Sequence, residues 1–379
     1  YVRKLVTIRE IDSVKHFSKA LNLANIGGWT TLVKKSMNFR ANEHVLYFEV
    51  DSFVPSHIMD KNAFCIPASV VTFNGIKGYR VATHIAKAGV GRSLRHVFTQ
   101  GQILRIDQFP EVEEYIAQEA TDDNGKVDYG FLSPIDLAPM IGVLKWEENT
   151  SLPPGTNFKT PSFVMKTDLE RVENCPNLFK KKKYTIHKFQ ETIKVDGATM
   201  TCYFVLNTSP KLSDLPPIQP SHHREAVQPN GRFGVCSKNC DLITWEKSNY
   251  WLTALGQEIH KKLSAYGKSI AIQGELVGWD IQRNFYGYNK GEYDYFVFSI
   301  TDIDCGTRWD PKQTELWCQE QGIKHVPVLG YYPITAIASR HQDLVDRAEL
   351  KPGEGHVYKN CFDNRAFKVL SKWYIMRHG

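Results

Sequence analysis

A lysine followed by an aspartate and a glycine gives this sequence its first candidate for covalent chemistry. Residues 189–197 read F-Q-E-T-I-K-V-D-G, so Lys194 ends an apolar-alternating run, with Asp196 and Gly197 directly behind it. Asp-Gly is a common turn dipeptide, and a surface lysine beside a β-turn is the simplest interpretation. The alternative is a nucleophile that takes a nucleotide onto its amine. The short motif alone does not decide between the two.

Three stretches downstream supply the carboxylates and the second cation that nucleotidyl transfer to an amine requires. I-Q-G-E-L-V-G places Glu275 on a predicted strand, and E-G-H-V-Y-K places Glu354 just before another. F-K-V-L-S places Lys368 within the last predicted strand. A lysine with an ordinary pKa of about 10.4 is protonated at neutral pH and cannot attack phosphorus. Lys194 therefore needs burial, a metal ion such as Mg²⁺, or a neighbouring cation such as Lys368 to favour its neutral amine.

The composition is that of an ordinary water-soluble globular protein. The chain has 379 residues, 42% of them hydrophobic and 23% charged, which is enough for about two domains. No stretch reaches the roughly 18 uninterrupted apolar residues of a membrane span. The net charge of +6 suits a polyanionic partner without requiring one. Eight cysteines are dispersed without a C-x-x-C motif, so we expect reduced thiols and an intracellular protein whose compartment is open.

The order of the predicted elements indicates an α+β protein with two domains. Residues 1–110 contain about five short strand-like runs separated by turn signals, which fit an OB-like β-barrel that binds nucleic acid. Residues 111–164 are acidic and loop-like, and we interpret them as a linker whose segment I-D-L-A-P-M-I-G-V-L-K-W-E-E docks on one domain or the other. Residues 165–379 mix helix-like and strand-like segments and predict a second, mixed α/β domain.

Three segments of the second domain have patterns of their own. Residues 166–179 predict a short helix capped by Thr167 or Asp168. Residues 207–230 are rich in proline and serine and predict a flexible insertion. Residues 250–267 have the apolar spacing of one helix.

The order of the motifs K-x-D-G, G-E-L, E-G-h-V and a strand lysine resembles that of the covalent nucleotidyltransferases. This superfamily contains DNA ligases, RNA ligases and messenger-RNA capping enzymes, and its second domain is an ATP-grasp-like nucleotidyltransferase domain. Further stretches are similar to nick-sealing, ATP-dependent RNA ligases of the Deinococcus type. They are V-R-K-L-V-T-I-R-E-I, G-W-T-T-L-V-K-K, Y-F-E-V-D-S-F-V-P-S, F-V-M-K-T-D-L-E-R-V-E-N-C-P-N-L-F, G-V-C-S-K-N-C-D-L and I-Q-R-N-F-Y-G-Y. DNA ligases and capping enzymes place another OB domain after the last strand motif. Only residues 373–379 follow Lys372, so we expect no C-terminal OB domain here.

The resemblance implies ligation of RNA in three steps. Lys194 attacks the α-phosphorus of ATP and forms a lysyl-adenylate, AMP moves to the 5′-phosphate of an RNA strand, and the neighbouring 3′-OH then displaces AMP. The catalytic residues implied are Lys194, Asp196, Glu275, Glu354 and Lys368, of which Asp196, Glu275 and Glu354 would hold Mg²⁺ or Mn²⁺. The ATP-binding residues implied are Arg171, Thr192, Ile193, Lys194, Gly197, Lys238, Glu275, Phe298, Glu354 and Lys368.

Several of these positions keep a second interpretation or depart from the family pattern. Phe298 either stacks on adenine or belongs to the core, and Arg171 either reaches a phosphate or forms a surface salt bridge. Lys238 stands where relatives usually have arginine, and a lysine loses the bidentate fork. Ile193 replaces a glutamate of many ligases, and Leu370 replaces a second strand lysine, so we expect weaker adenylylation rather than loss of activity.

Two other functions compete with RNA ligation. One is a DNA ligase or a capping-type nucleotidyltransferase, and the other is a non-catalytic nucleic-acid-binding homologue. Retention of all five catalytic candidates argues against the binder. The expected partner is RNA with 3′-OH and 5′-phosphate ends, at nicks in an RNA or RNA/DNA duplex, with no membrane and a monomeric enzyme. Basic residues of the barrel are expected to grip an RNA strand, among them Lys34, Lys35, Arg80 and Arg92.

Overall fold

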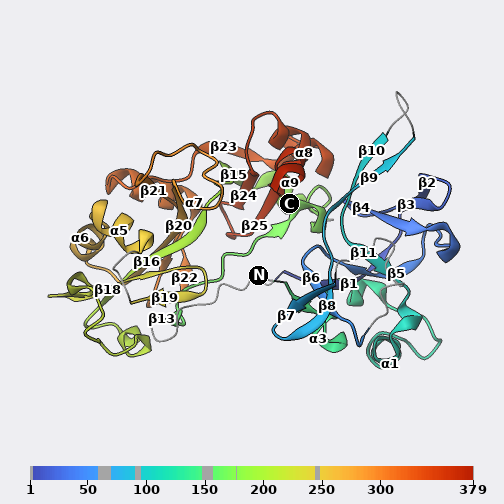
Figure 1. Ribbon diagram of the computed structural model, residues 1–379, viewed down its shortest axis with the longest axis horizontal. Helices are drawn as coiled ribbons and strands as arrows, with labels where there is room; N and C mark the ends of the chain where they lie inside the picture. Colours follow the sequence, from blue (N-terminus) through green and yellow to red (C-terminus); the bar gives the residue numbers. More distant parts are fainter. Residues whose placement is uncertain are drawn as a thin grey trace. The chain divides into compact units, whose positions relative to one another are not determined.

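The computed structural model describes residues 3–58, 70–89, 95–146, 157–175, 177–243 and 248–378. The chain forms two compact units (Figure 1). The N-terminal unit contains Val2–Thr150, Val172–Pro176 and Ile375–Gly379. The C-terminal unit contains Tyr1, Ser151–Arg171 and Asn177–Tyr374.

Short antiparallel strands make up the N-terminal unit. The sheet orders are β1-β5-β11, β2-β3-β4, β12-β6-β8-β7 and the pair β10-β9. The strands are β1 (Val6–Glu10), β2 (Ser13–His16), β3 (Leu21–Ile26), β4 (Trp29–Lys34), β5 (His44–Phe48), β6 (Ser52–Pro55), β7 (Val70–Phe73), β8 (Ile76–Arg80), β9 (His84–Ala88), β10 (Arg95–Thr99), β11 (Gln102–Leu104) and β12 (Leu144–Lys145). β5 pairs with both β1 and β11 and is buried from Val45 to Phe48, so it lies at the centre of this unit.

The segment that follows residue 110 belongs to the same unit. Helices α1 (Pro110–Glu119), α2 (Tyr129–Leu132) and α3 (Ala138–Ile141) are followed by β12, which pairs with β6. Val112 and Ile116 on one side of α1 are buried in the same apolar cluster as Phe48. Burial of this face explains why the unit extends to residue 150, whereas composition placed a boundary at 110 and a linker at 111–164.

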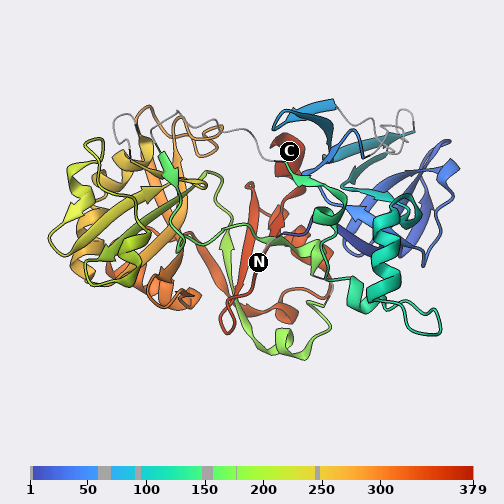
Figure 2. The same cartoon turned by 90° about the horizontal axis from the view of Figure 1, so that it is seen from below.

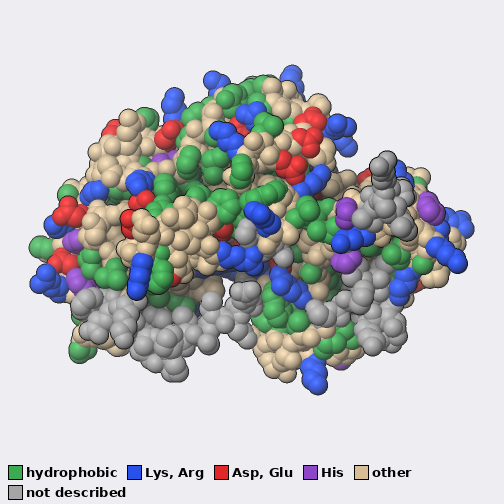
Figure 3. Space-filling model, turned by 45° about the horizontal axis from the view of Figure 1, so that its top comes forward, with side chains coloured by type: hydrophobic (Ala, Val, Ile, Leu, Met, Phe, Trp, Pro, Cys, Tyr) green, Lys and Arg blue, Asp and Glu red, His purple; other side chains and the backbone are tan. Residues whose placement is uncertain are grey.

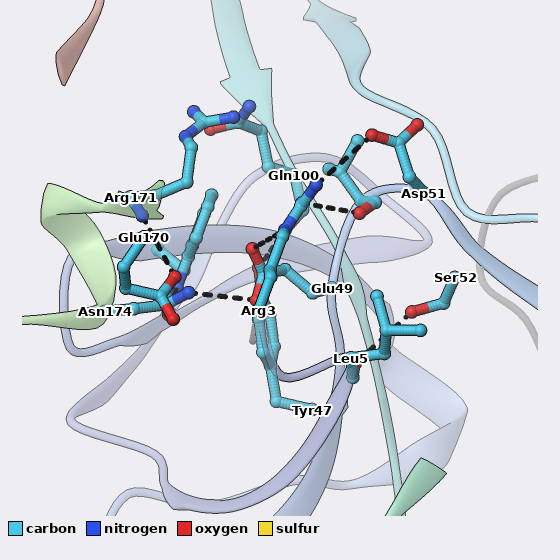
Figure 4. Close-up of polar contacts among 12 residues, drawn as sticks. Arg3, Leu5, Tyr47, Glu49, Asp51, Ser52, Gln100, Glu170, Arg171 and Asn174 are labelled. Carbon is cyan, nitrogen blue, oxygen red and sulfur yellow. Dashed lines mark hydrogen bonds and ion pairs between the residues drawn. The ribbon is translucent and has the colours of Figure 1, made fainter. Parts of the chain in front are cut away.

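A buried carboxylate ties residues 172–176 to the N-terminal unit (Figure 4). The side chain of Glu49 is 2% exposed and accepts a hydrogen bond from Nε of Arg3 at 2.8 Å. Its other oxygen accepts a bond from Nδ2 of Asn174 at 2.9 Å. The Oδ1 atom of Asn174 accepts bonds from Arg9 and from the indole of Trp29. A buried charge needs partners of this kind, and Asn174 is held in place by supplying one.

The C-terminal unit contains two β-sheets (Figures 1 and 2). The eight-stranded sheet has the order β13-β19-β18-β16-β20-β21-β22, with β17 paired to β18, and the five-stranded sheet has the order β14-β25-β24-β15-β23. The strands are β13 (Asn157–Lys159), β14 (Glu170–Arg171), β15 (Lys188–Ile193), β16 (Ala198–Leu206), β17 (Val227–Gln228), β18 (Gly231–Cys236), β19 (Cys240–Leu242), β20 (Ile270–Gly278), β21 (Tyr293–Asp302), β22 (Thr307–Arg308), β23 (Val328–Pro333), β24 (Gly355–Asn360) and β25 (Ala366–Leu370). The helices are α4 (Lys182–Ile186), α5 (Asn249–Gly256), α6 (Ile259–Tyr266), α7 (Pro311–Glu320), α8 (His341–Glu349) and α9 (Lys372–His378).

Helices α5 and α6 cover one face of the eight-stranded sheet (Figures 1 and 2). Trp251 of α5 and Leu263 of α6 are buried against strand residues such as Phe233 and Ile272. The helical spacing predicted for residues 250–267 corresponds to two helices, because Glu258 has a φ of 55° and interrupts the helical backbone between α5 and α6.

Two other local predictions differ from the structure. The helix predicted for residues 166–179 is wrong: Glu170–Arg171 forms β14, and Val172–Asn174 forms a 3₁₀ turn. The segment 207–230, predicted to be flexible, contains two 3₁₀ turns and β17, and it buries Leu215 and Ala226. Among the described residues, no helix combines the length and the apolar character that crossing a membrane requires.

Candidate active site

Lys194 lies in the turn that joins the two sheets of the C-terminal unit. β15 of the five-stranded sheet ends at Ile193, and β16 of the eight-stranded sheet begins at Ala198. The backbone N–H of Lys194 donates to the carbonyl of Gly355 at 2.8 Å, which holds the lysine beside the start of β24. A Cβ at Gly197 would lie 2.3 Å from the carbonyl oxygen of Leu276, so the close approach of this turn to β20 requires glycine.

The amine of Lys194 forms an ion pair with Glu354. Nζ lies 2.6 Å from Oε1, and the two side chains are 22% and 15% exposed. Glu354 is placed there by the entry into β24, where Gly355 has a φ of 137° and a Cβ would lie 2.0 Å from the carbonyl oxygen of Val369. The lysine of K-x-D-G and the glutamate of E-G-h-V therefore meet where two adjacent inner strands of the five-stranded sheet, β15 and β24, end and begin.

Glu275 adds a second carboxylate from the other sheet. It lies on β20 opposite Thr199 of β16, two residues after the K-x-D-G turn. Burial, together with the negative charges of Glu354 and Asp196, raises the pKa of Glu275 to about 8, although Lys194 opposes the shift. Burial alone would lower the pKa of Lys194, but Glu354, Glu275 and Asp196 outweigh it and raise this pKa. The four groups thus form one electrostatic unit that keeps the lysine protonated.

A cavity of about 230 Å³ opens beside this unit. Its lining includes seven of the predicted ATP-binding residues, from both sheets. They are Thr192, Ile193, Lys194, Lys238, Glu275, Phe298 and Lys368. Asp196, Gly197 and Glu354 are not among the lining residues, but they adjoin Lys194 as described above.

Arg171 is another predicted ATP-binding residue outside the lining of the cavity. It is 4% exposed and is not among the residues that line the cavity. Its strand β14 pairs in parallel with β25, and Arg171 lies opposite Lys368 in the register. Lys238, which replaces the family arginine, reaches the cavity and lies 3.5 Å from Asp168.

Sequence reasoning missed Lys359, which lines the same cavity. Its Nζ lies 5.2 Å from the ring centroid of Phe298 and donates to the Phe298 carbonyl. Burial, together with the charge of Arg308, lowers the pKa of Lys359 to about 7. The sequence contained a signal for it. Val357 of the E-G-h-V stretch lines the cavity, and Lys359, two residues later on the same strand, must lie on the same face. Arg308, Trp309, Thr314 and Asn364 also line the cavity without having been predicted.

The predicted metal ligands fit a partial cation site rather than a complete one. Within the described ranges, no three acidic, histidine or cysteine side chains gather closely enough to hold a metal ion by themselves. Asp196, Glu275 and Glu354 nevertheless interact electrostatically around Lys194. Carboxylate oxygens suit Mg²⁺ and Mn²⁺, and Mg²⁺ commonly binds through one or two carboxylates, substrate phosphates and waters. These residues fit a cation that a bound triphosphate would help to hold.

Comparisons with known proteins agree with both units. A family model described as RNA ligase matches residues 187–373, and a model described as an OB-fold domain matches residues 5–104. Among curated proteins, no match is found. The OB-fold model confirms the predicted OB-like barrel, and the RNA ligase model together with the observed strands and helices confirms the mixed α/β ligase domain that follows it.

Solved structures of Naegleria gruberi RNA ligase are similar to this chain over its whole length. The structure with PPi has 26% identity and a TM-score of 0.72, and the match covers 100% of this chain and 99% of that one. For a variant with AMP and Mn, the values are 25% and 0.73, with 99% of both chains covered. For a variant with ATP and Mn, they are 25% and 0.72, with 100% of this chain and 98% of that one covered. Together, these matches support an ATP-dependent RNA ligase of the nucleotidyltransferase superfamily.

Proposed function

We propose that this enzyme joins the 3′-OH and 5′-phosphate ends of RNA at nicks in a duplex, through a lysyl-adenylate on Lys194 and an adenylylated RNA end. The observation that carries the proposal is the placement of Lys194. This lysine lines a cavity with Glu275 and Lys368 and is paired at 2.6 Å with Glu354. The proposal includes the expectation that the enzyme is a nick-sealing RNA ligase of the Deinococcus type.

The relatives support ATP and a divalent cation as the ligands of this site. Matched structures of the Naegleria enzyme contain ATP and Mn, AMP and Mn, or PPi. In adenylylation, ATP is the substrate, AMP is the group transferred and PPi is the leaving group. Some of these structures carry a substituted lysine, aspartate, glutamate or second lysine. The aspartate follows the first lysine by two residues, and the second lysine follows the glutamate by fourteen. Lys194 and Asp196, and Glu354 and Lys368, have the same spacings.

The first step transfers AMP to Lys194. Asp196, Glu275 and Glu354 would hold a divalent cation, which would supply positive charge against the triphosphate; carboxylates engaged by the cation would stabilise protonated Lys194 less, which favours its neutral amine. The neutral Nζ then forms a bond to the α-phosphorus while the bond to the pyrophosphate oxygen breaks in line. Lys368 and Lys238 line the cavity and can neutralise charge on the phosphates. Positioning and charge neutralisation supply most of the catalysis in such a displacement.

The second and third steps use the same kind of displacement. An oxygen of the RNA 5′-phosphate attacks the phosphorus of the lysyl-adenylate, and the phosphorus–nitrogen bond to Lys194 breaks. The neighbouring 3′-OH then attacks the 5′-phosphate, and AMP leaves with the oxygen that had joined the two phosphates. Phe298 and Lys359 line the cavity and are the candidates for contacts with the adenosine.

The RNA-binding surface is an expectation from charge. On the face shown in Figure 3, lysine and arginine side chains are spread among acidic and neutral ones. Lys34 and Lys35 follow one another at the end of β4, whereas Arg80 lies 2.8 Å from Asp51 and Arg92 lies outside the described residues. We expect the barrel to hold RNA through residues such as Lys34 and Lys35, and the enzyme to act as an intracellular monomer.

The test is intact mass after incubation with ATP and Mg²⁺ or Mn²⁺. We expect wild type to gain one AMP, roughly 329 Da, and Lys194→Ala to gain nothing. Lys211→Ala is the matched control, because Lys211 lies outside the site and pairs with Asp214 on the surface, so this variant should be labelled like wild type.

Two further arms separate the alternatives. Labelling by GTP instead of ATP would indicate a capping-type enzyme, and sealing of an all-DNA nick in preference to an RNA nick would indicate a DNA ligase. A folded wild-type sample that is not already adenylylated and gains no AMP would indicate a non-catalytic nucleic-acid-binding protein.

A further inference from the structure

The loop between β20 and β21 touches the backbone of the K-x-D-G turn. This loop contains the stretch I-Q-R-N-F-Y-G-Y, to which the reaction steps above give no role. The phenol oxygen of Tyr286 accepts a hydrogen bond from the backbone N–H of Asp196 at 3.0 Å. Nε2 of Gln282 donates to the carbonyl of Gly197 at 3.3 Å. Gln282 and Asn284 have φ values of 50° and 48°, an uncommon conformation for residues other than glycine that the loop maintains here.

A second phenol reaches the same aspartate from α9. Tyr374 lies within hydrogen-bonding reach of the Asp196 side chain, and burial together with the charges of Glu354 and Asp196 raises the pKa of its phenol. Phe285 connects the two elements, because its ring centroid lies 5.1 Å from that of Tyr286 and 6.4 Å from that of Tyr374. Two elements that are distant in sequence thus hold the backbone and the side chain of one residue.

The other side of the turn is held by apolar packing. Val195, between Lys194 and Asp196, is 7% exposed and packs in a cluster with Val277 and Val326. Because Val195 is buried and the N–H of Asp196 is hydrogen-bonded to Tyr286, the backbone that joins these two residues has little freedom to rotate. The direction of the Lys194 side chain depends on that backbone.

We propose that Tyr286 and Tyr374 form a tyrosine clamp that positions Asp196 and, through the backbone of the turn, aims Lys194 at the α-phosphorus of ATP. The clamp rests on the proposed function, since it acts on the first adenylyl transfer. Neither tyrosine is among the residues that line the cavity, so both are positioning residues rather than catalytic ones. A misplaced nucleophile slows the chemical step far more than it weakens binding of the nucleotide.

Removal of single hydroxyl groups tests the clamp. Tyr286→Phe keeps the aromatic packing with Phe285 and deletes only the acceptor for the Asp196 N–H. Tyr374→Phe deletes only the donor to the Asp196 carboxylate. For each variant we expect the single-turnover rate of lysyl-adenylate formation to fall about tenfold, the size expected for loss of one hydrogen bond that orients the nucleophile, with KM for ATP unchanged.

A second readout does not depend on activity. Loss of its acceptor should speed hydrogen exchange of the Asp196 amide in Tyr286→Phe, measured on peptides that span residues 195–200. Tyr293→Phe is the matched control, because that hydroxyl donates to Asp280 at 2.8 Å at the other end of the loop and makes no contact with Asp196 that the structure describes. The control should match wild type in rate, in exchange and in melting temperature.

The outcomes separate the clamp from the proposed function. Slower adenylyl transfer with unchanged KM and faster Asp196 exchange supports the clamp. Wild-type rates in both phenylalanine variants overturn the clamp and leave the proposed function standing. Absence of any AMP adduct in wild type overturns the proposed function and, with it, the role of the clamp. If Tyr374→Phe fails to fold, Tyr286→Phe and Gln282→Ala still decide the question, because both contacts come from the surface loop.

Discussion

A buried charge cluster behind the nucleophile makes the stability of the C-terminal unit depend on pH. Glu191 lies on β15, three residues before Lys194, and its side chain is 0% exposed. Nε and NH2 of Arg347 on α8 lie 2.7 and 2.8 Å from its two oxygens. The hydroxyl of Tyr358 donates at 2.7 Å, and Nδ1 of His356 lies 3.1 Å away. Burial alone would raise the pKa of Glu191, but His356, Arg347 and Tyr358 lower it to about 2.

The contribution of Glu191 to the free energy of unfolding follows from this pKa. The ordinary value for the unfolded chain is 4.5, and the folded value is about 2. Each pH unit between these two values is worth about 1.4 kcal/mol, so ionised Glu191 contributes roughly 3 kcal/mol to the free energy of unfolding. Because the folded pKa is depressed, this contribution is complete above about pH 4.5 and is lost as the pH falls toward 2. We expect Glu191→Gln to lower the melting temperature at pH 7 by about 6–12 °C.

The assay is urea denaturation of wild type and Glu191→Gln at pH 7, 5, 4 and 3. The free-energy difference should be largest at pH 7 and should narrow as the pH falls below 4.5. Glu258→Gln is the control, because Glu258 and its partner Lys261 are 58% and 66% exposed, and solvent screens such a pair so that it contributes little to stability. A difference between wild type and Glu191→Gln that stays constant from pH 7 to 3, or that is absent at pH 7, would refute the reasoning.

Two further predictions concern the cavity. The pKa of Lys359 is lowered to about 7, so between pH 7 and 10.5 the unfolded state binds more protons than the folded state. The melting temperature of wild type should therefore rise relative to that of Lys359→Met over this range. Melting temperatures that change equally with pH in the two proteins would contradict the lowered pKa of Lys359. The pKa of Glu275 is raised to about 8, so the folded state binds more protons between pH 4.5 and 8; wild type should lose stability relative to Glu275→Gln as the pH rises through that range. Addition of Mg²⁺ with ATP at pH 7 should release more protons from wild type than from Glu275→Gln, and equal release by calorimetry in two buffers would contradict a role for Glu275 in holding the cation.

The elements that carry the catalytic candidates were predictable from local pattern. β15, β20, β24 and β25 have apolar alternation or continuous apolar runs, which predict strands without reference to the rest of the chain. The glycines beside them mark turns and close approaches, as Gly197 and Gly355 do in the structure. The sequence therefore indicates the turns beside Lys194 and Glu354, whereas Glu275 and Lys368 lie within the strands that the pattern predicts.

Pairing between distant segments was not predictable in the same way. Residues 166–179 have a capped-helix pattern, but Glu170 and Arg171 pair with Phe367 and Lys368 in a parallel register. Asn174 is engaged by Arg9, Trp29 and Glu49 of the N-terminal unit. Tertiary hydrogen bonds that satisfy buried charges outweigh a weak helix propensity in so short a segment. The interpretation of Arg171 as a helix-surface residue failed for this reason.

Catalytic candidates can be recognised from the sequence, whereas the residues that position them cannot be recognised in the same way. A nucleophile and the carboxylates around it must be particular residue types on neighbouring strands and turns, so type and spacing together single out Lys194, Glu275 and Glu354 as catalytic candidates. Tyr286 and Tyr374 need only bring a hydroxyl to Asp196, and 88 residues separate them in the chain. No local period or spacing connects a loop residue with a residue of the last helix, because the contact is created when both elements fold over one turn. Catalytic candidates can thus be found before the fold is known, whereas the residues that position them become visible only with it.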